Sequence, residues 1–163
     1  NELTAYSGNS KSRGIDVFMK QEYKGHSMWI SYTLSETLER FPYFSNSNYE
    51  RAFHDQRHEI KLAAILNFSP FFISANYVYG SGFPPNLITD TAYPYKRFDI
   101  AAIYRFHFKH AKIETGVSIL NLFNYENVKY ANFIKIPAED QSSIGVYSES
   151  VPFTPTLFLN ISI

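Results

Sequence analysis

The chain has 163 residues, with 15 basic and 15 acidic side chains and a formal net charge of zero, so it lacks the basic balance expected of a nucleic-acid-binding protein. It has no cysteine, which excludes disulfides and cysteine metal sites. Aromatic residues make up 18% of the chain, which is high for a globular protein, and no apolar run approaches the length of a transmembrane helix.

Seven segments alternate apolar and polar side chains with the period of a β-strand. In chain order, the predicted strands cover residues 14–23, 27–40, 55–68, 71–80, 97–107, 112–123 and 154–163. Val, Ile, Tyr, Phe and Thr dominate these segments, as pleated surfaces prefer. Most of the segments are 10 to 14 residues long, whereas an average strand has about five or six. We therefore expect an all-β fold with unusually long antiparallel strands.

Over residues 15–23, 28–34, 58–68, 71–79, 98–106, 113–123 and 157–163, the alternate positions that form one face are free of Asp, Glu, Lys and Arg. In the segment 58–68, for example, that face carries Ile60, Leu62 and Ala64, and the other face carries Glu59 and Lys61. The charged face of the predicted strands includes eight side chains that we expect to form a polar network: Asp55, Arg57, Glu59, Lys61, Arg97, Asp99, Arg105 and Glu114.

Aromatic residues mark both ends of the uncharged face. Phe98 lies near one end of its predicted strand, and Tyr104 and Phe106 lie near the other. The eight steps from Phe98 to Phe106 cover about 26 Å. A strand tilt of about 40° reduces this height to about 20 Å, close to the apolar band of an outer-membrane barrel with its aromatic girdles.

The predicted connections alternate between short and long. Residues 24–26, 69–70 and the region around 106–111 form short turns, while 41–54, 81–96 and 124–153 form long loops. Outer-membrane barrels have this asymmetry, with short periplasmic turns and long extracellular loops. A soluble β-sandwich also alternates apolar and polar residues and is the alternative fold. We therefore expect a transmembrane antiparallel β-barrel.

The predicted strand count is odd, whereas bacterial barrels made from one chain have an even number of strands. A seven-stranded sheet would also leave two open edges, which lipid does not tolerate. The chain has no initiating Met. We therefore expect residues 1–163 to be the C-terminal part of a larger barrel.

Short signatures resemble, in their order, the C-terminal barrel of a TonB-dependent outer-membrane receptor, in particular those of the Bacteroidota. These signatures are KSRGIDVFMKQEYKGHSMWISYTLSETLERF, FHDQRHEIKL, YGSGFP, YPYKRFDI, SILNLFNYEN and TPTLFLNISI. One departure is that the last segment stops at Ile163, where the closing strand of the family usually ends on an aromatic residue.

This resemblance implies a barrel of 22 strands, a plug domain upstream of this chain, and active import without covalent chemistry. It implies TonB, outer-membrane lipid and a scarce ligand as partners, and it allows for a surface lipoprotein. The ligand would be a siderophore, cobalamin, a glycan or a peptide, and the sequence does not identify which. A passive porin-type channel and a soluble or surface-displayed β-sandwich adhesin are the alternative functions.

The sequence predicts no catalytic, metal or cofactor site. Glu59 and Glu114 lack a His or hydroxyl partner at a defined spacing, and His54 and His58 would lie about 13 Å apart along one strand, too far to share an ion. Loop aromatics are candidate ligand contacts, although such loops also bury aromatics against themselves. The candidates are Tyr43, Tyr49, Tyr93, Phe133 and Tyr147.

Overall fold

The computed structural model describes residues 7–43, 48–84, 94–109, 111–137 and 143–162, without the side chains of 128–149. The described residues form strands, turns and bends and no helix. The strands are β1 (Asn9–Tyr23), β2 (His26–Arg40), β3 (Glu50–Arg51), β4 (His58–Phe68), β5 (Phe71–Gly80), β6 (Tyr95–His107), β7 (Lys112–Leu120), β8 (Val128–Pro137), β9 (Ser143–Glu149) and β10 (Thr154–Ser162). The predicted all-β class is confirmed. Among the described residues, no helix is long and apolar enough to span a membrane.

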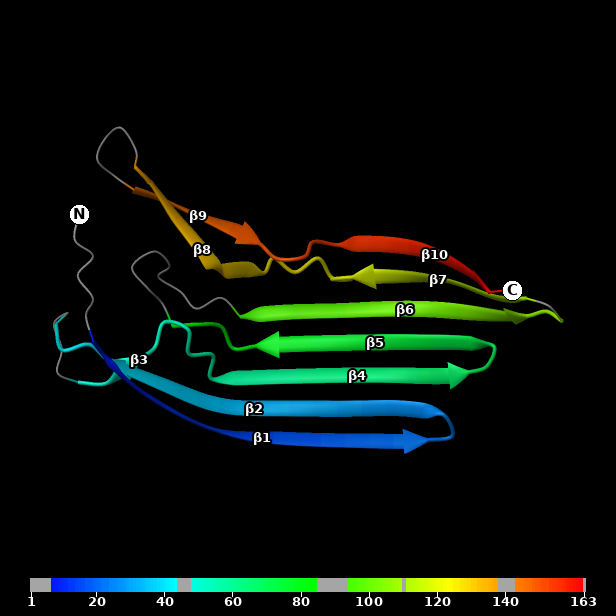
Figure 1. Ribbon diagram of the computed structural model, residues 1–163, viewed down its shortest axis with the longest axis horizontal. Helices are drawn as coiled ribbons and strands as arrows, with labels where there is room; N and C mark the ends of the chain where they lie inside the picture. The colour runs from blue at the N-terminus through cyan, green and yellow to red at the C-terminus, as the bar shows by residue number, and fades with distance from the viewer. Residues whose placement is uncertain (1–6, 44–47, 85–93, 110, 138–142, 163) are drawn as a thin grey trace.

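The long strands lie side by side in one antiparallel sheet (Figure 1). Their order is β1-β2-β4-β5-β6-β7-β10, and β3 adds a short pairing to β2. Within the described residues each outer strand, β1 and β10, has a single partner, so the sheet is open. β8 and β9 form a separate two-stranded sheet, which extends away from the ends of β7 and β10 (Figure 1).

All tight turns lie at one end of the sheet, and the long connections lie at the other (Figure 1). The turn between β1 and β2 consists of Lys24 and Gly25, which both have positive φ, at 48° and 81°. Two such residues form the hairpin turn whose twist matches that of the flanking strands. The turn between β4 and β5 is Ser69-Pro70. The predicted alternation of short and long connections is therefore confirmed.

The strand register places the predicted apolar positions on one face. Directly opposed residues in an antiparallel ladder share a face, and Leu62 pairs with Ile30 on β2 and Tyr77 on β5. The same row continues through Phe98 on β6. The neighbouring row on the other face joins Trp29, Ala63, Asn76 and Asp99. The prediction of one apolar and one polar face is confirmed.

The sheet buries almost none of its apolar side chains. Among the described residues, Ala52 is the buried hydrophobic residue, at 1% exposure. Ile15 is 66% exposed and Leu157 is 82% exposed, although both lie on the apolar face. A soluble domain would cover such a face with a second layer, and the described residues supply no such layer.

Several predicted boundaries were wrong. β4 begins at His58, so residues 55–57 precede the strand, and β7 ends at Leu120, so residues 121–123 follow it. The long loops 41–54 and 124–153 contain β3 and the β8–β9 hairpin. A shift of register between Lys129 and Ile134 interrupts that hairpin. Such a bulge breaks the period-two pattern, which explains why alternation did not reveal these strands.

Candidate functional site

The charged face of the sheet holds most of the predicted polar side chains as separate ion pairs. Glu59 and Lys61 alternate onto this face of β4, and the Lys61 Nζ lies 2.6 Å from Glu59 Oε1. Arg97 and Asp99 do the same on β6, where Arg97 Nε donates to Asp99 Oδ1 at 2.8 Å. Both pairs join residues two apart along one strand, because such residues point to the same side. Both lie toward the end of the sheet with the long connections.

Arg105 and Glu114 form a third pair at the opposite end of the sheet. Arg105 Nε donates to Glu114 Oε1 across the β6–β7 ladder at 2.5 Å. The guanidinium also lies over the ring of Phe72, 4.1 Å from its centroid. Arg97 and Arg105 are eight residues apart on one strand, which is about 26 Å. The eight predicted residues are therefore spread over the sheet and the connection before β4, and they do not meet in one network.

Asp55 is not a strand residue, contrary to the prediction. It lies in the connection before β4, is 2% exposed, and accepts a hydrogen bond from the backbone N–H of Thr37 at 2.7 Å. Arg51 Nε donates to its other carboxylate oxygen at 2.8 Å. Burial acts to raise the pKa of Asp55, but the hydrogen bonds from Arg51 and Thr37, with the nearby charges of Arg51 and Arg57, lower it on balance. Asp55 thus fastens the β2–β4 connection to β2.

Arg57 was also predicted as a strand residue but precedes β4, and its guanidinium reaches a carboxylate on β2. Arg57 Nη2 lies 3.0 Å from Glu36 Oε1 and 3.7 Å from Asp55 Oδ2. Glu36 pairs with Arg13 in the β1–β2 register, two positions beyond the pair Ile15–Leu34. Period-two alternation therefore places Glu36 on the apolar side of the sheet. Arg57, which was expected on the charged face, therefore contacts a carboxylate on the apolar side.

The loop aromatics have different surroundings. Tyr43 is 70% exposed and still interacts with a neighbour. Tyr49 packs against its own chain, with Lys11 Nζ 4.2 Å and the Arg40 guanidinium carbon 5.1 Å from its ring centroid. Tyr93 lies outside the described residues. Phe133 and Tyr147 lie in β8 and β9, whose side chains are also outside the described part, so their role as ligand contacts stays a prediction.

Two asparagines that were not selected from the sequence organise the end of the sheet. Asn121 is fully buried and has a φ of 51°, a left-handed conformation that Asn tolerates. Its Nδ2 donates to the carbonyls of Tyr125 at 2.9 Å and Val151 at 3.0 Å, and its Oδ1 accepts from the Tyr125 N–H at 3.0 Å. Asn127 exchanges hydrogen bonds with both backbone groups of Lys96, at 2.7 and 2.8 Å. Together they tie the base of the β8–β9 hairpin to β6 and β7.

The SILNLFNYEN segment contained the only available signal for this arrangement. Asn121 was expected inside the strand predicted over 112–123, whereas it follows β7 and turns its amide into the loop. Asn124, with a φ of 49°, repeats the left-handed conformation and accepts from the Phe153 N–H at 3.1 Å. Asn tolerates the left-handed conformation and favours turns, so Asn121 and Asn124 were a signal that the strand ends here.

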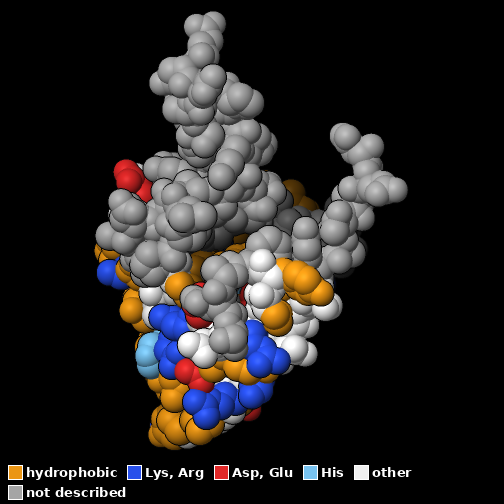
Figure 2. Space-filling model, turned by 90° about the vertical axis from the view of Figure 1, so that its left-hand side faces the viewer, with side chains coloured by type: hydrophobic (Ala, Val, Ile, Leu, Met, Phe, Trp, Pro, Cys, Tyr) orange, Lys and Arg blue, Asp and Glu red, His pale blue; other side chains and the backbone are white. Residues whose placement is uncertain are grey.

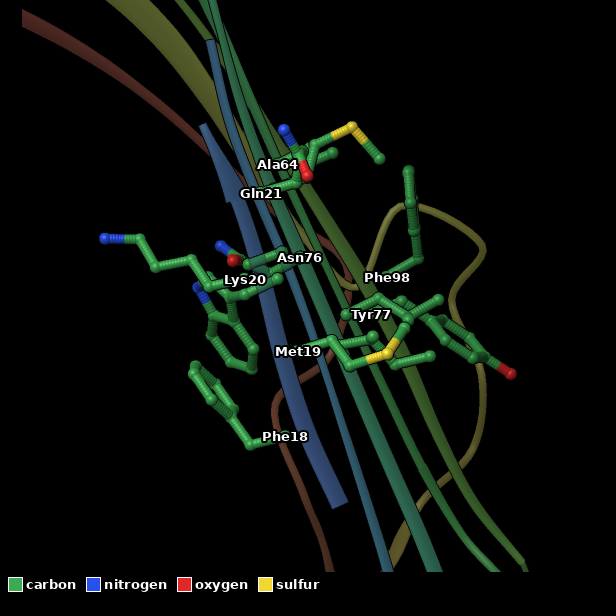
Figure 3. A pocket seen from close by; sticks show the side chains of 14 residues that line it. Phe18, Met19, Lys20, Gln21, Ala64, Asn76, Tyr77 and Phe98 are labelled. Carbon is green, nitrogen blue, oxygen red and sulfur yellow. The ribbon is translucent and has the colours of Figure 1, made fainter. Parts of the chain in front are cut away.

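The side chains around the middle of β1, β2, β4 and β5 do not enclose a single site. Phe18 and Lys20 project from one side of the sheet, while Met19, Tyr77 and Phe98 project from the other (Figure 3). These residues therefore belong to two open surfaces. The described residues contain no cluster of three His, Asp or Glu side chains that could hold a metal ion.

The two histidines considered above have separate partners. His54 Nδ1 lies 3.8 Å from Glu39 Oε1, and His58 Nδ1 is 2.9 Å from the Tyr32 hydroxyl.

No family model, curated protein or solved structure matches this chain.

Proposed function

We propose that this chain forms part of the wall of an outer-membrane β-barrel, and that the complete protein imports a scarce ligand by TonB-dependent active transport. The observation that carries the first part is the single-layer sheet with an uncovered apolar face. That face continues across seven strands, and its members include Met19, Leu62 and Leu159, at 62%, 38% and 62% exposure. Lipid is the solvent in which such a face is stable without a covering layer.

The opposite face supports a wet interior. Its charged side chains form local pairs such as Glu59–Lys61 and Arg97–Asp99, and Ser74, Asn76 and Ser118 alternate onto the same side. Charged and polar side chains are normal on the lumen wall of a barrel. These pairs are proposed as structural contacts of the wall, or as contacts to a plug domain or ligand.

The direction of the connections supports an orientation in the membrane. Tight turns face the periplasm, and the long connections with the β8–β9 hairpin face the outside, where a ligand arrives. The proposed ligand classes are siderophore, cobalamin, glycan and peptide, with TonB as the energy-transducing partner and a surface lipoprotein as a further one. No covalent chemistry is assigned to the chain. These assignments rest on the sequence resemblance described above.

A passive porin would present the same kind of wall, since it also has a polar lumen and an apolar outer band. The two functions differ in their energy source. Cells carrying the full-length protein should take up its ligand only when TonB is present and the proton-motive force is intact. Uptake that continues in a TonB deletion strain, or after addition of a proton uncoupler, would identify a passive pore.

A β-sandwich adhesin is the third alternative, and it needs a second sheet over the apolar face. In the described part of the chain the remaining sheet is the β8–β9 pair, which lies at one end of the molecule (Figure 1). Membrane fractionation of the full-length protein tests this alternative. Recovery as a monodisperse species in buffer without detergent would refute the barrel.

A further inference from the structure

The apolar face ends in a group of cations at the end of the sheet with the long connections. On β1, Arg13 and Lys11 continue the row that begins with Met19, Val17 and Ile15, since all are odd-numbered positions of one strand. Their partners on β2 are Glu36 and Leu38. The face that we assign to lipid thus changes from apolar to charged within two residues.

Other cations share this face. Arg40 follows Leu38 by two positions on β2, and Arg51 of β3 pairs with Leu38. Arg57 joins them through its contact with Glu36. Figure 2 looks onto this end of the sheet and shows Lys and Arg side chains gathered in its lower half, with fewer acidic side chains among them. We name Lys11, Arg13, Arg40, Arg51 and Arg57 the cationic rim.

Among the described residues, the strands carry no Lys or Arg on this face at the other end, where the nearby cation Lys24 belongs to the β1–β2 turn and lies over the Tyr23 ring. At the tight turns the corresponding strand positions carry uncharged side chains, among them Tyr23, Phe68, Phe71 and Phe106. The strand positions of this face therefore place their cations toward one side of the membrane. In the proposed orientation that is the outer leaflet.

The contacts within the rim crowd positive charge. Arg13 Nε donates to Glu36 Oε2 at 2.7 Å while Arg57 binds the other oxygen of the same carboxylate at 3.0 Å. Lys11 and Arg40 place their charges over the single ring of Tyr49. Two carboxylates, Glu36 and Asp55, lie among the five cations of the rim, so the rim keeps an excess of positive charge that a bound anion would offset. Arg13 stays accessible to such an anion from the lipid side, because it shares the apolar face of β1 with Ile15 and Val17.

A depression of about 300 Å³ connects the rim to the apolar face. Arg13, Glu36 and Arg57 line its charged part, and Ile15 and Leu34 line its apolar part. This arrangement matches an amphiphile with an anionic head and a hydrocarbon chain. Guanidinium groups bind phosphate oxygens through paired, charge-assisted hydrogen bonds.

We infer that the cationic rim binds the anionic, phosphate-bearing head group of a lipid in the leaflet on the long-loop side, with the acyl chains lying along Ile15 and Leu34. This inference rests on the proposed barrel. The sign of the charge selects an anion, and the continuity with the apolar face selects a lipid over a free phosphate ion.

Native mass spectrometry of the full-length protein in non-ionic detergent tests this inference. The probes are dilauroyl phosphatidic acid, dilauroyl phosphatidylcholine with identical chains, and glycerol 3-phosphate as a head group alone. The test variant is Lys11→Gln/Arg13→Gln. The matched control is Lys20→Gln/Lys112→Gln, which removes the same number of charges from exposed positions on the polar face.

We expect the wild type and the control to retain phosphatidic acid in preference to phosphatidylcholine. The test variant should lose roughly 25-fold in affinity for phosphatidic acid, since each of the two basic residues near an anionic head group contributes about fivefold. Equal loss in the control, or no loss in the test variant, would overturn the inference. Binding of glycerol 3-phosphate as tight as that of phosphatidic acid would replace the lipid with a free anion.

Folding is checked by heat-dependent mobility in gel electrophoresis. If the double variant does not fold, Lys11→Gln alone decides the matter, because it keeps the Arg13–Glu36 pair, and a loss of about fivefold is then expected. A detergent-dependent barrel without lipid preference would refute the inference alone. A protein that is soluble without detergent would refute the proposed function as well.

Discussion

Ala63 and Ala64 are adjacent alanines in the middle of β4 that point to opposite faces of the sheet. Ala64 pairs with Met28 and Ala75 on the apolar face, and Ala63 pairs with Trp29 and Asn76 on the polar face. Replacing each by Arg adds the same side chain at nearly the same height. The difference in stability between the two variants therefore reports the difference in environment between the two faces of the sheet.

The expected magnitude follows from the position of Ala64. It lies six residues from the start of β4 and four from its end, or about 20 and 13 Å along the strand. With a tilt of about 40° both ends are at least about 10 Å away in height, so Ala64 lies well inside the apolar band. Arg on the lipid face near the midplane destabilises a barrel by about 2–4 kcal/mol. At Ala63, where the new guanidinium would meet polar groups, we expect a loss below about 1 kcal/mol.

The assay is equilibrium folding of the full-length barrel into lipid vesicles, titrated with denaturant and followed by heat-dependent gel mobility. Leu62→Arg provides a second measurement on the apolar face, since Leu62 pairs with Ile30 and Tyr77. Equal losses for Ala63→Arg and Ala64→Arg would refute the assignment of one face to lipid.

Three further changes test the loops and the ladder. Asp55→Asn should destabilise the fold by about 1–3 kcal/mol because a buried, hydrogen-bonded carboxylate is lost. Folding lowers the pKa of Asp55, so its contribution to stability is complete above about pH 4 and is lost as the pH falls toward the folded-state pKa. The free energy of unfolding, measured between pH 7 and 3, should therefore change less with pH in the variant. Asn121→Ala removes the amide contacts to Tyr125 and should cost about 2–4 kcal/mol and speed amide exchange in residues 121–127. Gly116→Ala should cost about 1–3 kcal/mol, measured by the same denaturant titration, because the added Cβ would lie 2.5 Å from the Ala102 carbonyl oxygen.

Each of these changes has a control outcome. If the free energy of unfolding of Asp55→Asn still depends on pH as in the wild type, then groups other than Asp55 cause that dependence. Asn160→Ala on exposed β10 should leave amide exchange in residues 121–127 unchanged, and an equal effect would show that the Asn121 contacts are unimportant. A neutral Gly116→Ala would mean that β6 and β7 can separate without loss.

Alternation in the sequence was sufficient to predict the long strands, their faces and the end at which the tight turns lie. The reason is that side chains alternate strictly along a strand, so a strand whose two faces meet different solvents must carry a period-two pattern. Glu59, Lys61, Arg97 and Asp99 could therefore be placed on one face without coordinates. The pattern failed at Asp55 and Asn121, whose positions depend on hydrogen bonds to Thr37 and Tyr125.

The sequence by itself determined the all-β class, the apolar and polar faces and the arrangement of the connections, because these properties depend on local periodicity and turn chemistry. Tertiary structure alone decided which charges meet. It divided the expected polar network into pairs, directed Arg57 to Glu36, and assembled the cationic rim from β1, β2, β3 and the segment before β4. Contacts between distant segments depend on strand order and register, and a period-two pattern specifies the face of a side chain but leaves its partner undetermined.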